Sequence, residues 1–137
     1  MKRIAYMTLG FSVFIFLIVL AGFYFNARTL QSQSFYASVN VTDENVAGFD
    51  ANWTALTFGS LGKGGTSTRK IKLENGYPFP VAVIINVEGD IAPLLNHDKI
   101  IKIEKGERKI IALNAYAPLN LSQGFYSGRV EFLFKPA

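Results

Sequence analysis

Residues 66–87 read TSTRKIKLENGYPFPVAVIINV. Polar and apolar residues alternate over 66–73, which predicts a strand with one side facing solvent. Residues 80–87 are apolar at nearly every position, as in a central strand that is buried on one face and partly covered on the other. Residues 75–78, NGYP, are turn formers. This stretch therefore predicts two strands joined by a turn.

The rest of the chain after residue 34 has the same texture of short β-type runs separated by turn residues. The spacing is typical of an all-β fold, an antiparallel immunoglobulin-like β-sandwich of about seven strands. The expected strands are residues 35–41, 55–58, 66–73, 80–87, 99–103, 108–116 and 125–134.

Two local features complete this expected sandwich. Residues 90–97 predict one short helical turn, because Asp90 can cap it and Pro93 suits its first positions. The strands FYASVNV (35–41) and RVEFLF (129–134) lie near the two ends of the domain sequence, so we expect them at sheet edges, open to strand addition.

The N-terminal segment, residues 1–28, has a different character. Residues 4–25 contain no charge, and as an α-helix they would reach roughly 33 Å, close to the bilayer's apolar core of about 30 Å. Tyr6 and Tyr24 lie near the ends, where amphipathic rings prefer the headgroup zone. We therefore predict one transmembrane helix over about 4–25.

A cleaved signal peptide is the alternative to a retained signal-anchor. The apolar run is longer than the usual signal core of about 7–15 residues, and Phe25 stands where a cleavage site wants a small residue. Lys2 and Arg3 precede the helix, which predicts a cytoplasmic N-terminus. Residues 29–34 would be a short polar tether, and residues 35–137 an extracytoplasmic domain.

Composition excludes several classes of function. The full chain carries a formal net charge of +4, but three cations flank the helix, and residues 29–137 have 11 Lys+Arg against 10 Asp+Glu. A nucleic-acid interface would need a basic face, so no nucleic-acid partner is expected. The chain has no cysteine, which rules out thiolate nucleophiles, thiolate metal sites and disulfides.

The run FGSLGKGGTST (58–68) superficially suggests a phosphate-binding loop. That loop needs a hydroxyl residue directly after its lysine and a helix after that, but Lys63 is followed by two glycines and then by a strand pattern. We therefore expect no nucleotide and interpret the run as a turn whose glycines supply positive φ angles. Phe58 is the expected core residue of this run.

Few polar residues suggest chemistry. His97 has no acid or hydroxyl constellation around it in the sequence, and a solvated loop position is expected. Asp43, Glu44 and Asp50 could supply oxygen ligands to calcium, but their spacing matches no known loop. We therefore predict no catalytic residue, no metal and no cofactor, and a protein that is not an enzyme.

Asparagine triplets and aromatic residues are the remaining candidates. Asn40, Asn52 and Asn120 each begin an Asn-x-Ser/Thr triplet and are possible glycosylation sites in an exported domain. The aromatic residues could form a ligand platform, although filling the core of a cysteine-free sandwich is the more ordinary role. They are Trp53, Phe58, Tyr77, Phe79, Tyr116, Phe125, Tyr126, Phe132 and Phe134.

The order of motifs over about residues 36–135 resembles ASH and MSP-like domains, which are PapD-like immunoglobulin-like sandwiches. The resemblance rests on Leu56, Phe58 and Gly59, then Gly62 or Gly64, then Leu73 and Asn75, Pro80, the glycine turn in 103–113, and the proline and G-x-Y-x-G pattern in 117–132. It implies a binding or scaffolding module without catalytic residues. This chain departs from many relatives in having a membrane anchor. Small anchored sandwiches of this kind resemble archaeal envelope proteins.

These observations predict a non-enzymatic, single-pass protein of the cell membrane that displays its domain at the cell surface. The expected partner is an envelope protein, a surface layer or a glycan. Two alternatives stay open: a pilin-like filament subunit, although MTLGFSVF (7–14) lacks the usual basic residue and glutamate around a prepilin cleavage site, and an accessory subunit of a membrane complex.

Overall fold

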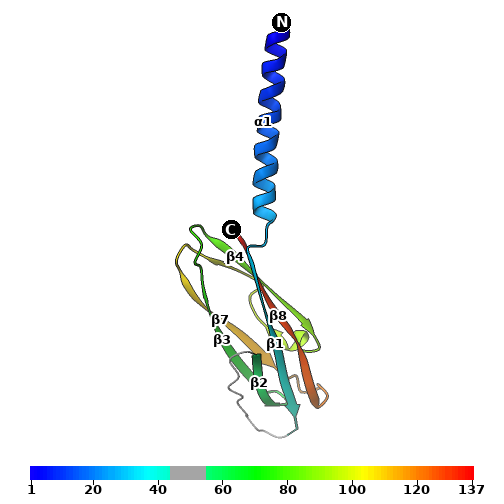
Figure 1. The fold of residues 1–137 in the computed structure, drawn as a ribbon. Helices are drawn as coiled ribbons and strands as arrows, with labels where there is room; N and C mark the ends of the chain where they lie inside the picture. The colour runs from blue at the N-terminus through cyan, green and yellow to red at the C-terminus, as the bar shows by residue number, and fades with distance from the viewer. Residues whose placement is uncertain (44–54) are drawn as a thin grey trace.

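The computed structural model describes residues 1–43 and 55–137. Helix α1, Lys2–Ala27, projects away from a β-domain (Figure 1). Its segment Lys2–Phe25 contains an 18-residue window with a mean hydropathy of 2.4 and no buried residues. Within the described residues it is the one helix that is long and apolar enough to cross a membrane, as an anchor or a signal sequence would be.

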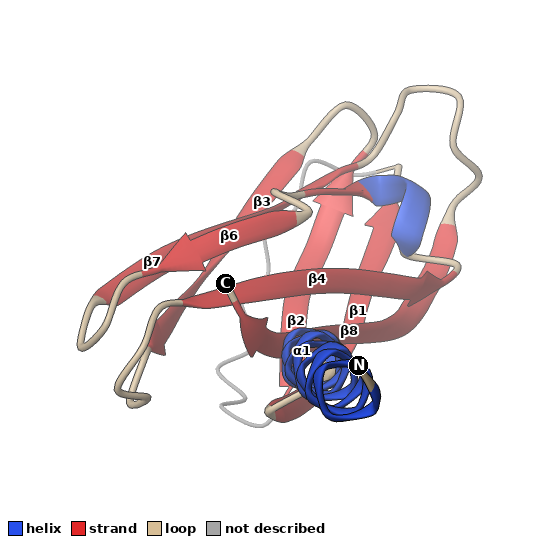
Figure 2. Ribbon diagram, turned by 90° about the horizontal axis from the view of Figure 1, so that it is seen from above, coloured by secondary structure: helices blue, strands red, loops and turns tan. Residues whose placement is uncertain are grey.

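The β-domain contains eight strands among the described residues, arranged in two sheets (Figure 2). The five-stranded sheet has the order β2-β1-β8-β4-β6, and the three-stranded sheet has the order β3-β7-β5. The strands are β1 Gln31–Thr42, β2 Ala55–Gly62, β3 Thr66–Glu74, β4 Val81–Gly89, β5 Leu95–Asn96, β6 Ile100–Ile103, β7 Arg108–Tyr116 and β8 Gly124–Pro136.

The predicted count of seven strands is therefore wrong by one. The additional strand is the two-residue β5, which lies inside the segment 90–97 that was expected to form a helical turn. That turn exists as the 3₁₀ helix η1, Ala92–Leu94, with proline in its first positions as expected. Its N-cap is Ile91 rather than Asp90, and no side chain caps it.

The prediction that the first and last strands form sheet edges is also wrong. β1 and β8 pair antiparallel along their length, from Gln31 opposite Phe134 to Val41 opposite Gly124. β8 pairs with β4 on its other side, so both of its edges are occupied. The edges of this sheet are β2 and β6, because a strand's place in a sheet follows its partners and not its place in the chain.

The sequence predicted an antiparallel sandwich, but the five-stranded sheet contains one parallel pair. β2 runs parallel to β1, with Tyr36 opposite Ala55 and Asn40 opposite Ser60. The register shifts between Ser38 and Asn40, and Gly59 there has φ 73°. A glycine accommodates this irregularity because positive φ is strained for residues with a Cβ.

The expected tether over residues 29–34 is largely part of β1. The backbone N–H of Leu30 donates to the Phe134 carbonyl at 2.8 Å, and strand pairing begins at Gln31. A polar sequence can still form a strand when its backbone finds a partner. Only residues 28–30 separate the helix from the sheet.

The core lies between the two sheets and is built from inward-facing apolar residues. Phe58 is 2% exposed, as predicted, and Phe132 is fully buried. In β7 the buried positions alternate strictly at Ile111, Leu113 and Ala115. Buried residues of both sheets belong to one hydrophobic cluster, so each sheet contributes one face to a single core.

Candidate interaction surfaces

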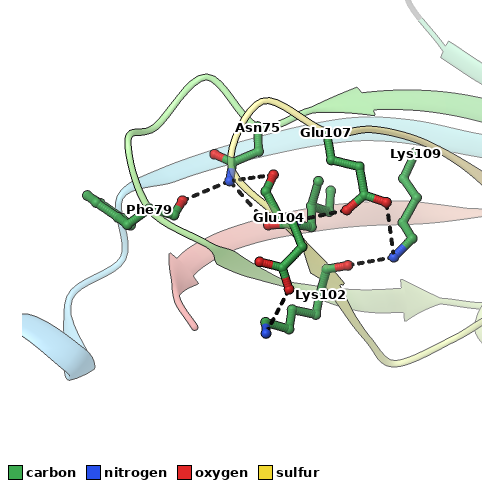
Figure 3. A network of polar contacts seen from close by, with 7 residues as sticks. Asn75, Phe79, Lys102, Glu104, Glu107 and Lys109 are labelled. Carbon is green, nitrogen blue, oxygen red and sulfur yellow. Dashed lines mark hydrogen bonds and ion pairs between the residues drawn. The ribbon is translucent and has the colours of Figure 1, made fainter.

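The end of the domain next to the helix is organised by Asn75, which is 1% exposed (Figure 3). Its Nδ2 donates to the carbonyl oxygens of Phe79 at 2.8 Å, Glu104 at 3.1 Å and Ile103 at 3.2 Å. Its Oδ1 accepts from the backbone N–H of Tyr77 at 2.9 Å. One buried amide thus joins the end of β3, the β3–β4 loop and the β6–β7 turn.

The backbone of Asn75 strengthens the same junction. Its N–H donates to the Glu107 carbonyl at 3.0 Å, and its carbonyl accepts from Gly106 at 3.1 Å. Asparagine suits this position because it offers donors and an acceptor on one short side chain. We call the three joined segments, residues 75–80, 103–107 and the end of β3, the Asn75 cluster.

Charged side chains surround the Asn75 cluster in compensated pairs. Lys102 pairs with Glu104 at 2.8 Å and Lys109 with Glu107 at 3.7 Å. The Lys109 Nζ also donates to the Lys102 carbonyl at 2.7 Å. These exposed pairs orient the β6–β7 turn but contribute little stability each.

Aromatic rings connect this end of the domain to α1. Tyr77 and Phe79 stack with their centroids 5.6 Å apart. Phe25, in the last turns of the helix, meets Phe79 edge-on at 5.8 Å. The β3–β4 loop therefore touches the end of the apolar helical segment.

Two grooves run along unpaired strand edges. Among the described residues, β5 pairs with β7 only at Leu95–Ala115 and Asn96–Asn114, and no other described strand pairs with β7 on that side. A groove of about 380 Å³ follows that edge and is lined in part by His97 and Ile110. His97 lies in the loop between β5 and β6, as expected, but it is half-buried and not fully solvated; its Nδ1 lies 2.9 Å from the Asp98 carbonyl oxygen.

A second groove, of about 500 Å³, opens between β1 and β3 beside the Asn75 cluster. Gln31 and Gln33 line it, opposite Phe134 and Phe132 in the β-register. β2 pairs with β1 only from Tyr36 onward, and no other strand in residues 1–43 and 55–137 pairs with the first part of β1 on that side. The accessible backbone edge at this groove is therefore the N-terminal half of β1. The C-terminal half of β1 is paired on both sides.

The end of the domain far from α1 carries exposed apolar side chains. Phe125 is 63% exposed and lies opposite Asn40 in β1, roughly 30 Å along that strand from Gln31. Tyr116 and Leu119, 47% and 75% exposed, lie at the end of β7 and in the loop after it. The expectation that the aromatic residues fill the core holds for Phe58, Phe132 and Phe134 but not for Tyr116 and Phe125; Trp53 lies outside the described residues.

The predicted turn between β2 and β3 exists but is shorter than the glycine-rich run 58–68: only residues 63–65 separate the two strands, and residues 58–62 belong to β2. Gly64 has φ 80°, and its N–H donates to the Ala117 carbonyl at 2.5 Å. Lys63 pairs with Asp43 at 2.8 Å. In the described part of the chain no group of three or more histidine, cysteine or acidic residues could hold a metal; Glu44 and Asp50 lie outside that part.

The asparagine triplets occupy different settings. Asn120 is exposed in the loop between β7 and β8, with Ser122 also exposed. Asn40 is exposed within β1, between β8 and β2. Asn52 lies outside the described residues. Of the two that can be placed, Asn120 has the more open setting.

Sequence reasoning found Asn75 only as a turn residue and as part of a family-like pattern. Its role in joining loops depends on the carbonyls of residues 103 and 104, which are distant in the chain. The contact of Phe79 with the helix had no signal in the sequence. The chain was compared with protein-family models, with curated proteins and with solved structures, and none of them matches, so the resemblance to ASH and MSP-like domains stays a prediction.

Proposed function

We propose that this chain is a single-pass membrane protein that holds a non-enzymatic, immunoglobulin-like β-sandwich outside the cell for contact with another envelope protein. The observation that carries the proposal is the helix: Lys2–Phe25 contains an 18-residue window of mean hydropathy 2.4 with no residue buried against the domain. A surface so apolar needs a nonaqueous partner, and its length suits a bilayer.

The rest of the molecule supports a display role. α1 passes through residues 28–30 directly into β1, which crosses the whole domain. The exposed Tyr116, Leu119 and Phe125 lie at the opposite end. Aromatic and aliphatic side chains of this kind anchor protein interfaces, so this distal end is the proposed contact surface.

The proposal is tested in native membranes with the full chain. The protein should stay with the membrane on alkaline extraction. A photo-crosslinking amino acid at Leu119 should capture a discrete envelope protein, whereas the same group at Ala112, exposed in mid-domain, should not. Release by alkali, or equal labelling from both positions, would reject the membrane-display role.

A pilin-like filament subunit is the second candidate, because a projecting helix that is apolar on every side could also pack into a helical filament core. Electron microscopy of the assembled envelope separates the two. Long filaments made of this chain would replace the display role, while dispersed single copies would exclude the filament.

A further inference from the structure

We propose that the helix-proximal end of the β-domain is a lipid-binding face, with Phe79 and Tyr77 in the headgroup layer of the bilayer that α1 crosses. The inference rests on the proposed membrane anchor and goes beyond it, since an anchored domain could equally hang free of the surface. It commits to phospholipid headgroups as the occupant.

The depth of Phe79 follows from its contact with Phe25. The uncharged segment 4–25 is about as long as the hydrocarbon core, which places Phe25 near its outer boundary. The headgroup layer adds about 5–8 Å on each side. The Phe79 ring lies 5.8 Å from Phe25, so its distance from this boundary is no greater than about the thickness of the headgroup layer.

Tyr77 extends the same face. Its ring stacks on Phe79 at 5.6 Å, and both side chains are only partly buried by the protein. Amphipathic and aromatic rings are favoured at the membrane–water boundary. The Asn75 hydrogen bonds hold the loop that presents them, so the rings are positioned before they meet lipid.

Positive charge accompanies the rings. Arg28 follows the helix and is exposed, and Lys135 lies near the end of β8, where the Ala137 N–H donates to the Pro80 carbonyl at 3.1 Å. Neither cation has an ion pair among the described residues, in contrast to Lys102 and Lys109. Cations without an ion pair at this end of the domain suit the phosphates of an anionic bilayer.

The consequence is a fixed orientation of the domain relative to the bilayer. A connection of three residues, an aromatic contact and two cations hold one end at the bilayer. The distal end with Leu119 and Phe125 then points away from the membrane, about the length of β1 above it. A surface held at that height is accessible to a partner outside the lipid.

The test uses tryptophan fluorescence of the full chain in phosphatidylcholine–phosphatidylglycerol vesicles. Trp53→Phe removes the one native tryptophan, and a single tryptophan is then introduced by Phe79→Trp, by Phe125→Trp as the distal control, or by Phe14→Trp as the mid-helix control. Lipids brominated near the headgroup should strongly quench the Phe79→Trp emission and leave the Phe125→Trp emission unchanged. Tyr77→Trp provides a second reporter if Phe79→Trp does not fold.

The outcomes separate the lipid face from the anchor. Quenching of Phe14→Trp without quenching of Phe79→Trp and Tyr77→Trp would reject the lipid face and keep the anchor. Failure to quench Phe14→Trp by lipids brominated in mid-chain would reject both. Arg28→Gln with Lys135→Gln should weaken the quenching of Phe79→Trp, and an unchanged signal would overturn the role of the two cations.

Discussion

The side-chain Nδ2 of Asn75 donates to the carbonyl oxygen of Phe79 at 2.8 Å, within the six-residue loop 75–80, and the Phe79 ring touches the helix. The same buried amide binds the carbonyls of Ile103 and Glu104. A local turn, a distant turn and the helix contact therefore depend on one side chain.

Asn75→Ala should destabilise the domain by about 3 kcal/mol, because three carbonyls and the Tyr77 N–H lose their side-chain partner in a mostly buried site. Asn114→Ala is the matched control, since Asn114 is exposed and should cost about 0.5 kcal/mol or less. Urea unfolding of the two variants measures the difference. Equal stabilities would contradict the central role of Asn75.

Phe58→Ala should cost about 3–5 kcal/mol, because it would empty a core position that is 2% exposed. Phe125→Ala makes the same chemical change at a side chain that is 63% exposed and should change the free energy of unfolding by about 0.5 kcal/mol or less. Lys63→Ala should also be nearly neutral, since its ion pair with Asp43 is exposed. A small thermal shift for Phe58→Ala would show that this ring is not in the core.

Gly128→Ala should be strongly destabilising, because a Cβ there would lie 1.9 Å from the Glu88 carbonyl oxygen. The β4 and β8 backbones pair closely at Gly89 and Gly128, so the expected cost is about 3 kcal/mol or more. Gly76→Ala has open space around the added methyl group and serves as the control. Similar melting temperatures for both variants would refute this close approach.

Residues 31–35 should exchange backbone hydrogens more slowly than an unstructured peptide of the same sequence, because they pair with β8. Hydrogen exchange read by mass spectrometry on the detergent-solubilised chain measures this. Exchange at the unstructured rate would show that the short polar tether predicted from the sequence is correct. It would also contradict the short connection on which the fixed orientation of the domain depends.

Features that depend on neighbours in the sequence could be predicted, whereas features that depend on partners far along the chain could not. Phe58 and the glycine turn were predictable, because alternation and turn chemistry are local signals. The polar start of β1 and its parallel pairing with β2 were not, since both depend on partners far along the chain. The same holds for Asn75, whose neighbours in sequence say nothing of Ile103, and for the contact between Phe25 and Phe79.

The membrane orientation of the full chain is the most direct test of the display role, and the absence of native cysteine makes it simple to measure. Ser122→Cys, in an exposed distal position, and Lys2→Cys, before the helix, are labelled on intact cells with a membrane-impermeant maleimide. We expect Ser122→Cys to react at once and Lys2→Cys to react only after permeabilisation. Labelling of Lys2→Cys on intact cells, with Ser122→Cys protected until permeabilisation, would contradict display of the domain outside the cell.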